Sequence, residues 1–109
     1  YYSLEDQTSY EETDEGYELT WLVPESNEKE MESLILKLEK NSSYKTFDPS
    51  ESETLCYVLK GKCKLKLGDE EFIASSKESF YFLATSEHRL SNPFDEECEV
   101  LIVATNSYL

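Results

Sequence analysis

Histidine is scarce in this sequence: the 109 residues include one, His88. Glycine and proline number only 3 each, which excludes collagen-like and low-complexity chains. No apolar run approaches the roughly 20 residues that span a membrane, and no secretory leader is recognisable. We therefore expect a cytoplasmic protein. The sequence starts at Tyr1 rather than at a methionine, so we also expect a processed chain or a fragment of a longer protein.

Positive charge is scarce as well. Lys and Arg total 10 against 24 Asp and Glu, a formal net charge of −14. Proteins bind nucleic acid largely by neutralising phosphates with Lys and Arg, so we expect no direct contact with nucleic acid and none with membranes. The lysines that cluster alternate with other residues over 60–66, which predicts one solvated face of a strand. A weak anion-contacting stripe is the alternative.

The three cysteines, Cys56, Cys63 and Cys98, are widely spaced, and no C-x-x-C pair occurs. A zinc knuckle or a thioredoxin-type motif is therefore unsupported. Cys56 and Cys63 lie inside strand-like runs, where a free cysteine behaves as a small buried apolar residue. We expect reduced thiols in the core.

Short β-branched and aromatic runs dominate what the chain does contain. They predict strands at 17–23, 54–60, 62–67, 71–74, 79–84, 88–92 and 99–105, and Leu67-Gly68-Asp69-Glu70 predicts a tight hairpin. Strands that recur every 8–12 residues or so are typical of an all-β sandwich or barrel.

The N-terminal third is ambiguous. In Met31–Lys40 the apolar residues fit both a helical face and a strand, and local propensity favours a helix. We assign Glu32–Glu39 to a strand, because the downstream barrel would otherwise lack a partner for its edge. Residues 1–16 are acidic and form either an extra strand or the remnant of a linker, and residues 17–109 form a single domain.

The order of several segments resembles the cupin family. They are Thr54–Gly61, Leu65–Phe72, Ser79–Phe82, His88–Pro93 and Val100–Thr105. More narrowly, these segments resemble the C-terminal cupin of bacterial XRE-type helix-turn-helix regulators, and Leu19–Pro24 and Met31–Ser42 fit the lead-in strands of that subgroup. The resemblance spans residues 17–105. It implies a cupin-type β-barrel, also called a double-stranded β-helix or jelly roll.

The first family motif, G-x5-H-x-H-x3–4-E-x6-G, is degenerate here. Gly61 occupies its final glycine, and Thr54 replaces the glutamate. The two histidine positions fall on Asp48 and Ser50, or on Phe47 and Pro49 with the longer spacer.

The second motif, G-x5-P-x-G-x2-H-x3-N, keeps His88 and Asn92, while Lys77, Leu83 and Thr85 replace its glycines and proline. Metal-binding cupins usually supply three histidines and a carboxylate. One histidine, even with Asp48, Glu51 or Glu53, makes a poor metal site, so we expect no metal and no other cofactor.

If the strand keeps the family's register, His88 and Leu90 point into the barrel and Arg89 and Ser91 point outward. His88 is then either hydrogen-bonded in the barrel wall or in contact with a small ligand, a contact sensitive to pH. The candidate pocket walls, each also explained by core packing, are Trp21, Tyr57, Tyr81 and Phe82. We identify no catalytic residues, since the sequence has no G-x-S-x-G elbow and no glycine-rich phosphate loop.

These features predict a non-catalytic regulatory domain. By the resemblance, it binds an effector or mediates dimerisation in a transcription regulator whose helix-turn-helix precedes Tyr1, and it forms a homodimer. Two alternatives stay open. One is a small metal-dependent isomerase or dioxygenase, and the other is a purely structural dimerisation domain.

Overall fold

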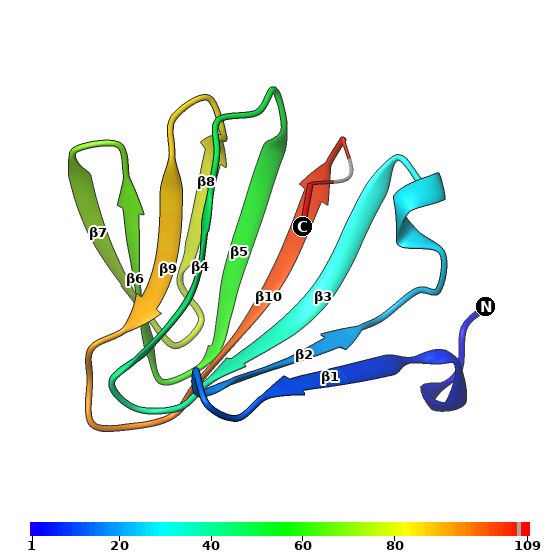
Figure 1. Ribbon diagram of the computed structural model, residues 1–109, viewed down its shortest axis with the longest axis horizontal. Helices are drawn as coiled ribbons and strands as arrows, with labels where there is room; N and C mark the ends of the chain where they lie inside the picture. The colour runs from blue at the N-terminus through cyan, green and yellow to red at the C-terminus, as the bar shows by residue number, and fades with distance from the viewer. Residues whose placement is uncertain (107) are drawn as a thin grey trace.

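Ten strands are the main elements of the computed structural model, which describes residues 1–106 and 108–109 (Figure 1). The strands are β1 (Thr8–Glu12), β2 (Tyr17–Trp21), β3 (Met31–Leu38), β4 (Ser42–Phe47), β5 (Glu53–Lys60), β6 (Lys62–Leu67), β7 (Glu70–Ser75), β8 (Ser79–Leu83), β9 (His88–Asn92) and β10 (Cys98–Thr105). Two short 3₁₀ turns, Leu4–Asp6 and Ser26–Glu28, complete the described elements. In this part of the chain no helix is long or apolar enough to cross a membrane.

The strands form two antiparallel sheets. One has six strands in the order β1-β2-β3-β10-β5-β8, and the other has four in the order β4-β9-β6-β7. Figure 1 shows the sheets converging at one end and separating toward the other. The all-β, jelly-roll prediction is confirmed.

Alternation of side chains makes the core. Along β3 and β10 every second residue is buried, and cross-strand neighbours such as Leu36 and Val100 are fully enclosed. Burying a side chain of this size contributes about 1.5–3 kcal/mol. β3 lies between β2 and β10, so paired neighbours on both sides outweigh the helix propensity of its sequence. The strand assigned to 32–39 is confirmed.

The predicted hairpin at Leu67-Gly68-Asp69-Glu70 is also confirmed. Leu67 pairs with Glu70, and Gly68 has a φ of +58°, which suits the first central position of a two-residue hairpin turn. Residues 1–16 contain strand β1, which pairs with β2 in the six-stranded sheet. Strand β4 was not predicted, because its sequence is mostly polar and its pairing with β9 is interrupted between Ser43 and Thr46.

Candidate functional site

A polar cluster lies inside the barrel, centred on His88. β9 alternates so that His88, Leu90 and Asn92 are buried while Arg89 faces outward. His88 is 4% exposed. The predicted register of this strand is confirmed, and it brings the chain's one imidazole into the space between the sheets.

Aromatic rings enclose the imidazole. The Phe47 ring stacks on it at 5.0 Å between centroids, with an interplanar angle of 20°. Phe82 and Tyr108 contact it edge-on, at 5.0 Å and 5.7 Å. The Tyr108 ring also lies 5.1 Å from Phe47. Three of these rings come from β4, β8 and β9, whereas Tyr108 follows β10.

Hydrogen bonds link the cluster across the two sheets. The Tyr108 hydroxyl lies 3.3 Å from Nε2 of His88 and 2.5 Å from Oγ1 of Thr54 on β5. Nδ1 of His88 has no hydrogen-bond partner among the residues that the structure describes. Among these residues, the hydrogen bond that orients the imidazole is therefore the one at Nε2.

Burial controls the titration of both rings. It lowers the pKa of His88, an effect that the backbone of Ser86 opposes in part. It raises the pKa of Tyr108 to about 12. Near pH 7 a neutral imidazole thus faces a neutral phenol, and either group can donate the hydrogen bond.

A buried carboxylate contacts the residue that follows Tyr108. Glu32 on β3 is 3% exposed, and its Oε1 accepts a hydrogen bond from the backbone N–H of Leu109 at 3.0 Å. Its Oε2 accepts one from Ser26 at 3.1 Å. Within the described residues Glu32 forms no ion pair.

The positions of the degenerate metal motif do not form a metal site. Asp48 is exposed, Ser50 is half-buried, and Thr54 already bonds to Tyr108. Glu51 and Glu53 are also exposed. What surrounds His88 is two hydroxyls and aromatic rings, a donor set that fits neither zinc nor non-haem iron. Over residues 1–106 and 108–109, no three His, Cys, Asp or Glu side chains cluster as ligands.

The predicted pocket walls divide into two groups. Phe82 is 7% exposed and contacts His88, and Trp21 packs against the core. The placement of Tyr57 and Tyr81 in the pocket is wrong. Strand alternation turns both to the outer face of the six-stranded sheet, where Tyr81 is 66% exposed and donates to Glu53 at 2.7 Å.

Sequence reasoning missed three residues of the site. From the sequence, Phe47 was named only as a position that aligns with a motif histidine when the longer spacer is used, and not as a neighbour of His88. Glu32 lies at the start of a strand among many other carboxylates, and nothing in its local sequence marks it as buried. Tyr108 lies beyond the last strand, and only the fold brings it back to β9.

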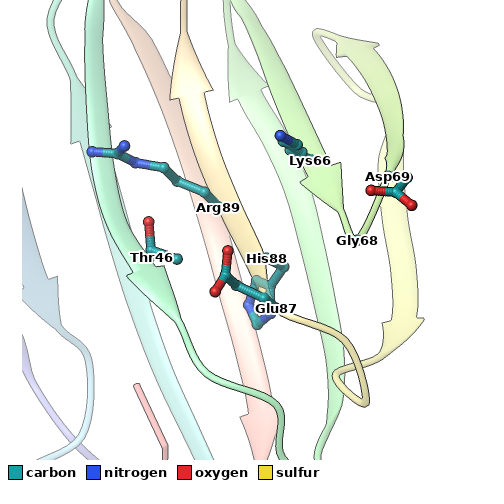
Figure 2. Close-up of a pocket in the computed structure, with 7 residues that line it drawn as sticks. All are labelled: Thr46, Lys66, Gly68, Asp69, Glu87, His88 and Arg89. Atoms are coloured by element: carbon teal, nitrogen blue, oxygen red, sulfur yellow. The ribbon is translucent and has the colours of Figure 1, made fainter.

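A groove of about 510 Å³ lies near β9 but outside the barrel. Figure 2 shows its lining: Thr46, Lys66, Gly68, Asp69, Glu87, His88 and Arg89. Arg89 extends over β4, where its Nε donates to the backbone oxygen of Tyr44 at 2.6 Å. The groove carries charges of both signs. It lies on the face where Lys62, Lys64 and Lys66 alternate outward along β6, as predicted for these lysines.

Comparison with known proteins identifies the fold. A family model described as a cupin domain matches residues 35–104. No curated protein matches the sequence. The cupin domain of Cnp3 from Schizosaccharomyces pombe superposes with a TM-score of 0.76 at 12% identity, over 95% of this chain and 72% of that one.

Two bacterial structures are equally similar. The cupin domain of an XRE family transcriptional regulator from Enterobacter cloacae has a TM-score of 0.74 and 13% identity, over 83% of this chain and 96% of that one. KdgF from Halomonas sp. has a TM-score of 0.76 and 11% identity, over 97% of this chain and 92% of that one. The structural neighbours also include FeII HppE. Identities this low show the fold alone.

Proposed function

Because this chain belongs to the cupin family, we propose that it is a non-catalytic regulatory domain whose barrel binds a small effector. The observation that carries the proposal is the cluster around His88. Where metal-dependent cupins hold a metal, this barrel has one imidazole, the hydroxyls of Thr54 and Tyr108, and a lining of aromatic rings. A few convergent polar groups set among apolar rings form a lining that suits recognition of a small molecule.

The similarity to a regulator's cupin domain supports a role in transcription regulation. We propose that a helix-turn-helix elsewhere in the parent protein contacts DNA, while this acidic domain senses the effector. The effector would act by favouring one of two arrangements of the DNA-binding heads. The net charge of −14 supports this division, because such a chain is repelled by phosphate.

Elemental analysis of the purified chain, prepared without chelators, tests the proposal. We expect far less than one metal ion per chain, whatever the metal. A metal near one per chain that is lost in His88→Ala, but retained in Arg89→Ala, would overturn the proposal and favour the metal-dependent isomerase or dioxygenase. Arg89 is the matched control, since it neighbours His88 but faces outward.

We also propose a homodimer, formed through an outer apolar patch on the six-stranded sheet. The patch comprises Ile35, Leu55, Tyr57, Tyr81, Leu101 and Val103. These residues are neighbours across β3, β10, β5 and β8 and carry no charge. We infer a second copy as the occupant, because two chains of net charge −14 repel each other least where both present an uncharged face.

Sedimentation equilibrium at high micromolar concentration tests the dimer. Since salt screens the repulsion, the dimer should tighten as salt rises. Tyr81→Asp should weaken it strongly, whereas Ile73→Asp, on an exposed residue of β7 in the other sheet, should not. A monomer at every salt concentration would contradict the proposal. A dimer whose barrel binds no small molecule would favour the purely structural domain.

A cytoplasmic location is part of the same proposal. Cys56, Cys63 and Cys98 are buried free thiols, which a reducing compartment preserves. Recovery of the parent protein in a secreted fraction would contradict it.

A further inference from the structure

We propose that Tyr108 is an internal occupant of a binding site for phenolic amines, and that the effector of this barrel is a small molecule in which a hydroxyphenyl group carries a protonated amine. The inference rests on the proposed effector-binding function. It names the class of ligand and assigns Tyr108 and Leu109 the role of a competitor.

The first half of the ligand follows from the surroundings of the Tyr108 ring. Its hydroxyl meets His88 Nε2 at 3.3 Å and Thr54 Oγ1, and its ring contacts Phe47 edge-on at 5.1 Å. A site that already holds a partly buried phenol ring and bonds its hydroxyl has the size and polarity for another phenol. His88 and Thr54 both donate or accept as required, so a free phenol can make the same two hydrogen bonds.

The protonated amine, the second half of the ligand, follows from the surroundings of Glu32. This carboxylate is 3% exposed, yet its two oxygens accept only from the Leu109 N–H and the Ser26 hydroxyl. A buried carboxylate is normally paired with a cation, because neutral donors offset its desolvation only in part. When Tyr108 and Leu109 leave, Oε1 loses the Leu109 donor. An ammonium group in its place restores a hydrogen bond and adds the missing positive charge.

Tyr108 and Leu109 link these two contacts at a fixed spacing. The same short chain of carbon atoms that separates the Tyr108 ring from the Leu109 nitrogen separates the ring from the nitrogen in 4-(3-aminopropyl)phenol. This amine therefore reaches His88 and Glu32 together. Tyr108 and Leu109 lie outside the strand ladders, so a ligand can replace them without breaking a sheet. His88 Nδ1, buried and unpartnered within the described residues, adds a second polar atom for a larger ligand.

Calorimetric titration with 4-(3-aminopropyl)phenol tests the inference, using the full chain and its Tyr108→Ala variant at physiological salt. The variant should bind about tenfold more tightly or better, since a Tyr108 side chain that fills the site in most molecules lowers the apparent affinity by that factor. Equal affinity for the two chains would overturn the competition.

Two analogues and one substitution separate the halves of the ligand. 3-Phenylpropylamine lacks only the hydroxyl, and p-cresol lacks the aminoalkyl chain, so both should bind the Tyr108→Ala chain at least about tenfold more weakly. Glu32→Gln in that background should remove the preference for the amine over p-cresol. If p-cresol binds the Tyr108→Ala chain as tightly as the amine, the role of Glu32 is wrong.

A measurement on the unaltered chain covers the case in which Tyr108→Ala does not fold. In two-dimensional amide NMR spectra, saturating amine should move the Leu109 signal toward its unstructured position and shift signals of β9 and β5. Shifts confined to the amide signals of exposed Asp and Glu residues would overturn the inference. A metal-free barrel that ignores the amine removes only this inference, whereas a metal lost with His88→Ala removes the proposed function itself.

Discussion

The hydroxyl of Tyr108 lies 3.3 Å from Nε2 of His88 and also bonds to Thr54, so one side chain beyond the last strand connects both sheets of the barrel. His88 belongs to the four-stranded sheet and Thr54 to the six-stranded one. The sheets separate at this end of the barrel (Figure 1). The stability of the barrel and the accessibility of its interior therefore depend on the same tyrosine.

Tyr108→Phe isolates the contribution of this hydroxyl. The ring and its packing stay, while His88 and Thr54 each lose a hydrogen-bond partner inside the barrel. We expect the free energy of unfolding to fall by about 1–2 kcal/mol, as measured by urea denaturation, because buried polar groups left unpaired are expensive.

Tyr81→Phe is the matched control. Tyr81 also donates a hydrogen bond to a side chain, Glu53, but it is 66% exposed. In the monomer water replaces that partner, so under low-salt conditions that keep the chain monomeric we expect no measurable change. An equal fall in the free energy of unfolding of the two variants would show that the hydrogen bonds of the Tyr108 hydroxyl stabilise the barrel no more than an exposed hydrogen bond does.

The pH dependence of stability should carry the signature of His88. Burial lowers the pKa of this imidazole in the folded chain, so below the unfolded value near 6.5 the unfolded chain binds the extra proton first. The associated stability is complete above that value. It is lost as the pH falls toward the folded pKa, by at most about 1.4 kcal/mol per pH unit.

His88→Gln provides the comparison, since it removes the titrating group while keeping a polar side chain. Chemical denaturation of both chains between about pH 8 and pH 5 should show the unaltered chain losing stability relative to the variant as the solution becomes acidic. The carboxylates are common to both chains, so their contribution cancels. Parallel curves would show that His88 titrates alike in the folded and unfolded states.

The sequence predicts most of the wall of this barrel and little of what fills it. Alternating apolar residues over β5, β6, β8, β9 and β10 determine which side chains point inward, and His88 follows from that alternation. The same rule, applied to Tyr57 and Tyr81, places them outside. Those two were chosen for their aromatic character rather than for their register with buried neighbours such as Cys56 and Phe82.

The remaining site residues depend on contacts between distant segments. Glu32 on β3 and Leu109, which follows β10, are joined by a hydrogen bond, and no local pattern encodes that pair. Strand β4 escaped detection because its polar sequence is stabilised by pairing with β9 rather than by burial of alternate residues. Phe47, at the end of that strand, was consequently not placed against His88.

Lys77 is a residue whose replacement should stabilise the chain. It occupies a position where the family motif has glycine, and its φ is +72°. The turn closes with a hydrogen bond from Glu78 N–H to the Ser75 oxygen at 2.9 Å, and a positive φ at the third turn residue favours glycine. Lys77→Gly should raise the free energy of unfolding by about 0.5–1 kcal/mol, because relief of the left-handed strain exceeds the entropy that glycine adds to the unfolded chain.

Ser76→Gly tests that explanation at the neighbouring position. Ser76 has no positive φ, and its hydroxyl donates to the Leu59 oxygen at 3.3 Å. Glycine there gains nothing and adds only unfolded-state entropy, so thermal denaturation should show a lower midpoint. A stabilising Ser76→Gly would point to general loosening of the turn instead of strain at Lys77.

Asn92 closes the end of the barrel opposite the Tyr108 cluster, and changing it to aspartate should be severely destabilising. The side chain is fully buried, and its Nδ2 donates to the backbone oxygens of Leu38 and Glu39 at 3.2 Å and of Glu96 at 2.6 Å. Asn92→Asp puts a carboxylate oxygen against these carbonyls, so we expect a loss of about 3 kcal/mol or more in urea unfolding.

The pH response and a control identify the cause of that loss. Acidification should shrink the deficit of Asn92→Asp, since a protonated carboxyl again offers a donor to the carbonyls. Asn106→Asp makes the same chemical change at an exposed residue that bonds to one backbone oxygen, that of Glu51, and should shift stability by no more than about 0.5 kcal/mol. Comparable losses at the two positions would mean that added negative charge on a chain of net charge −14, rather than the lost donor, is responsible.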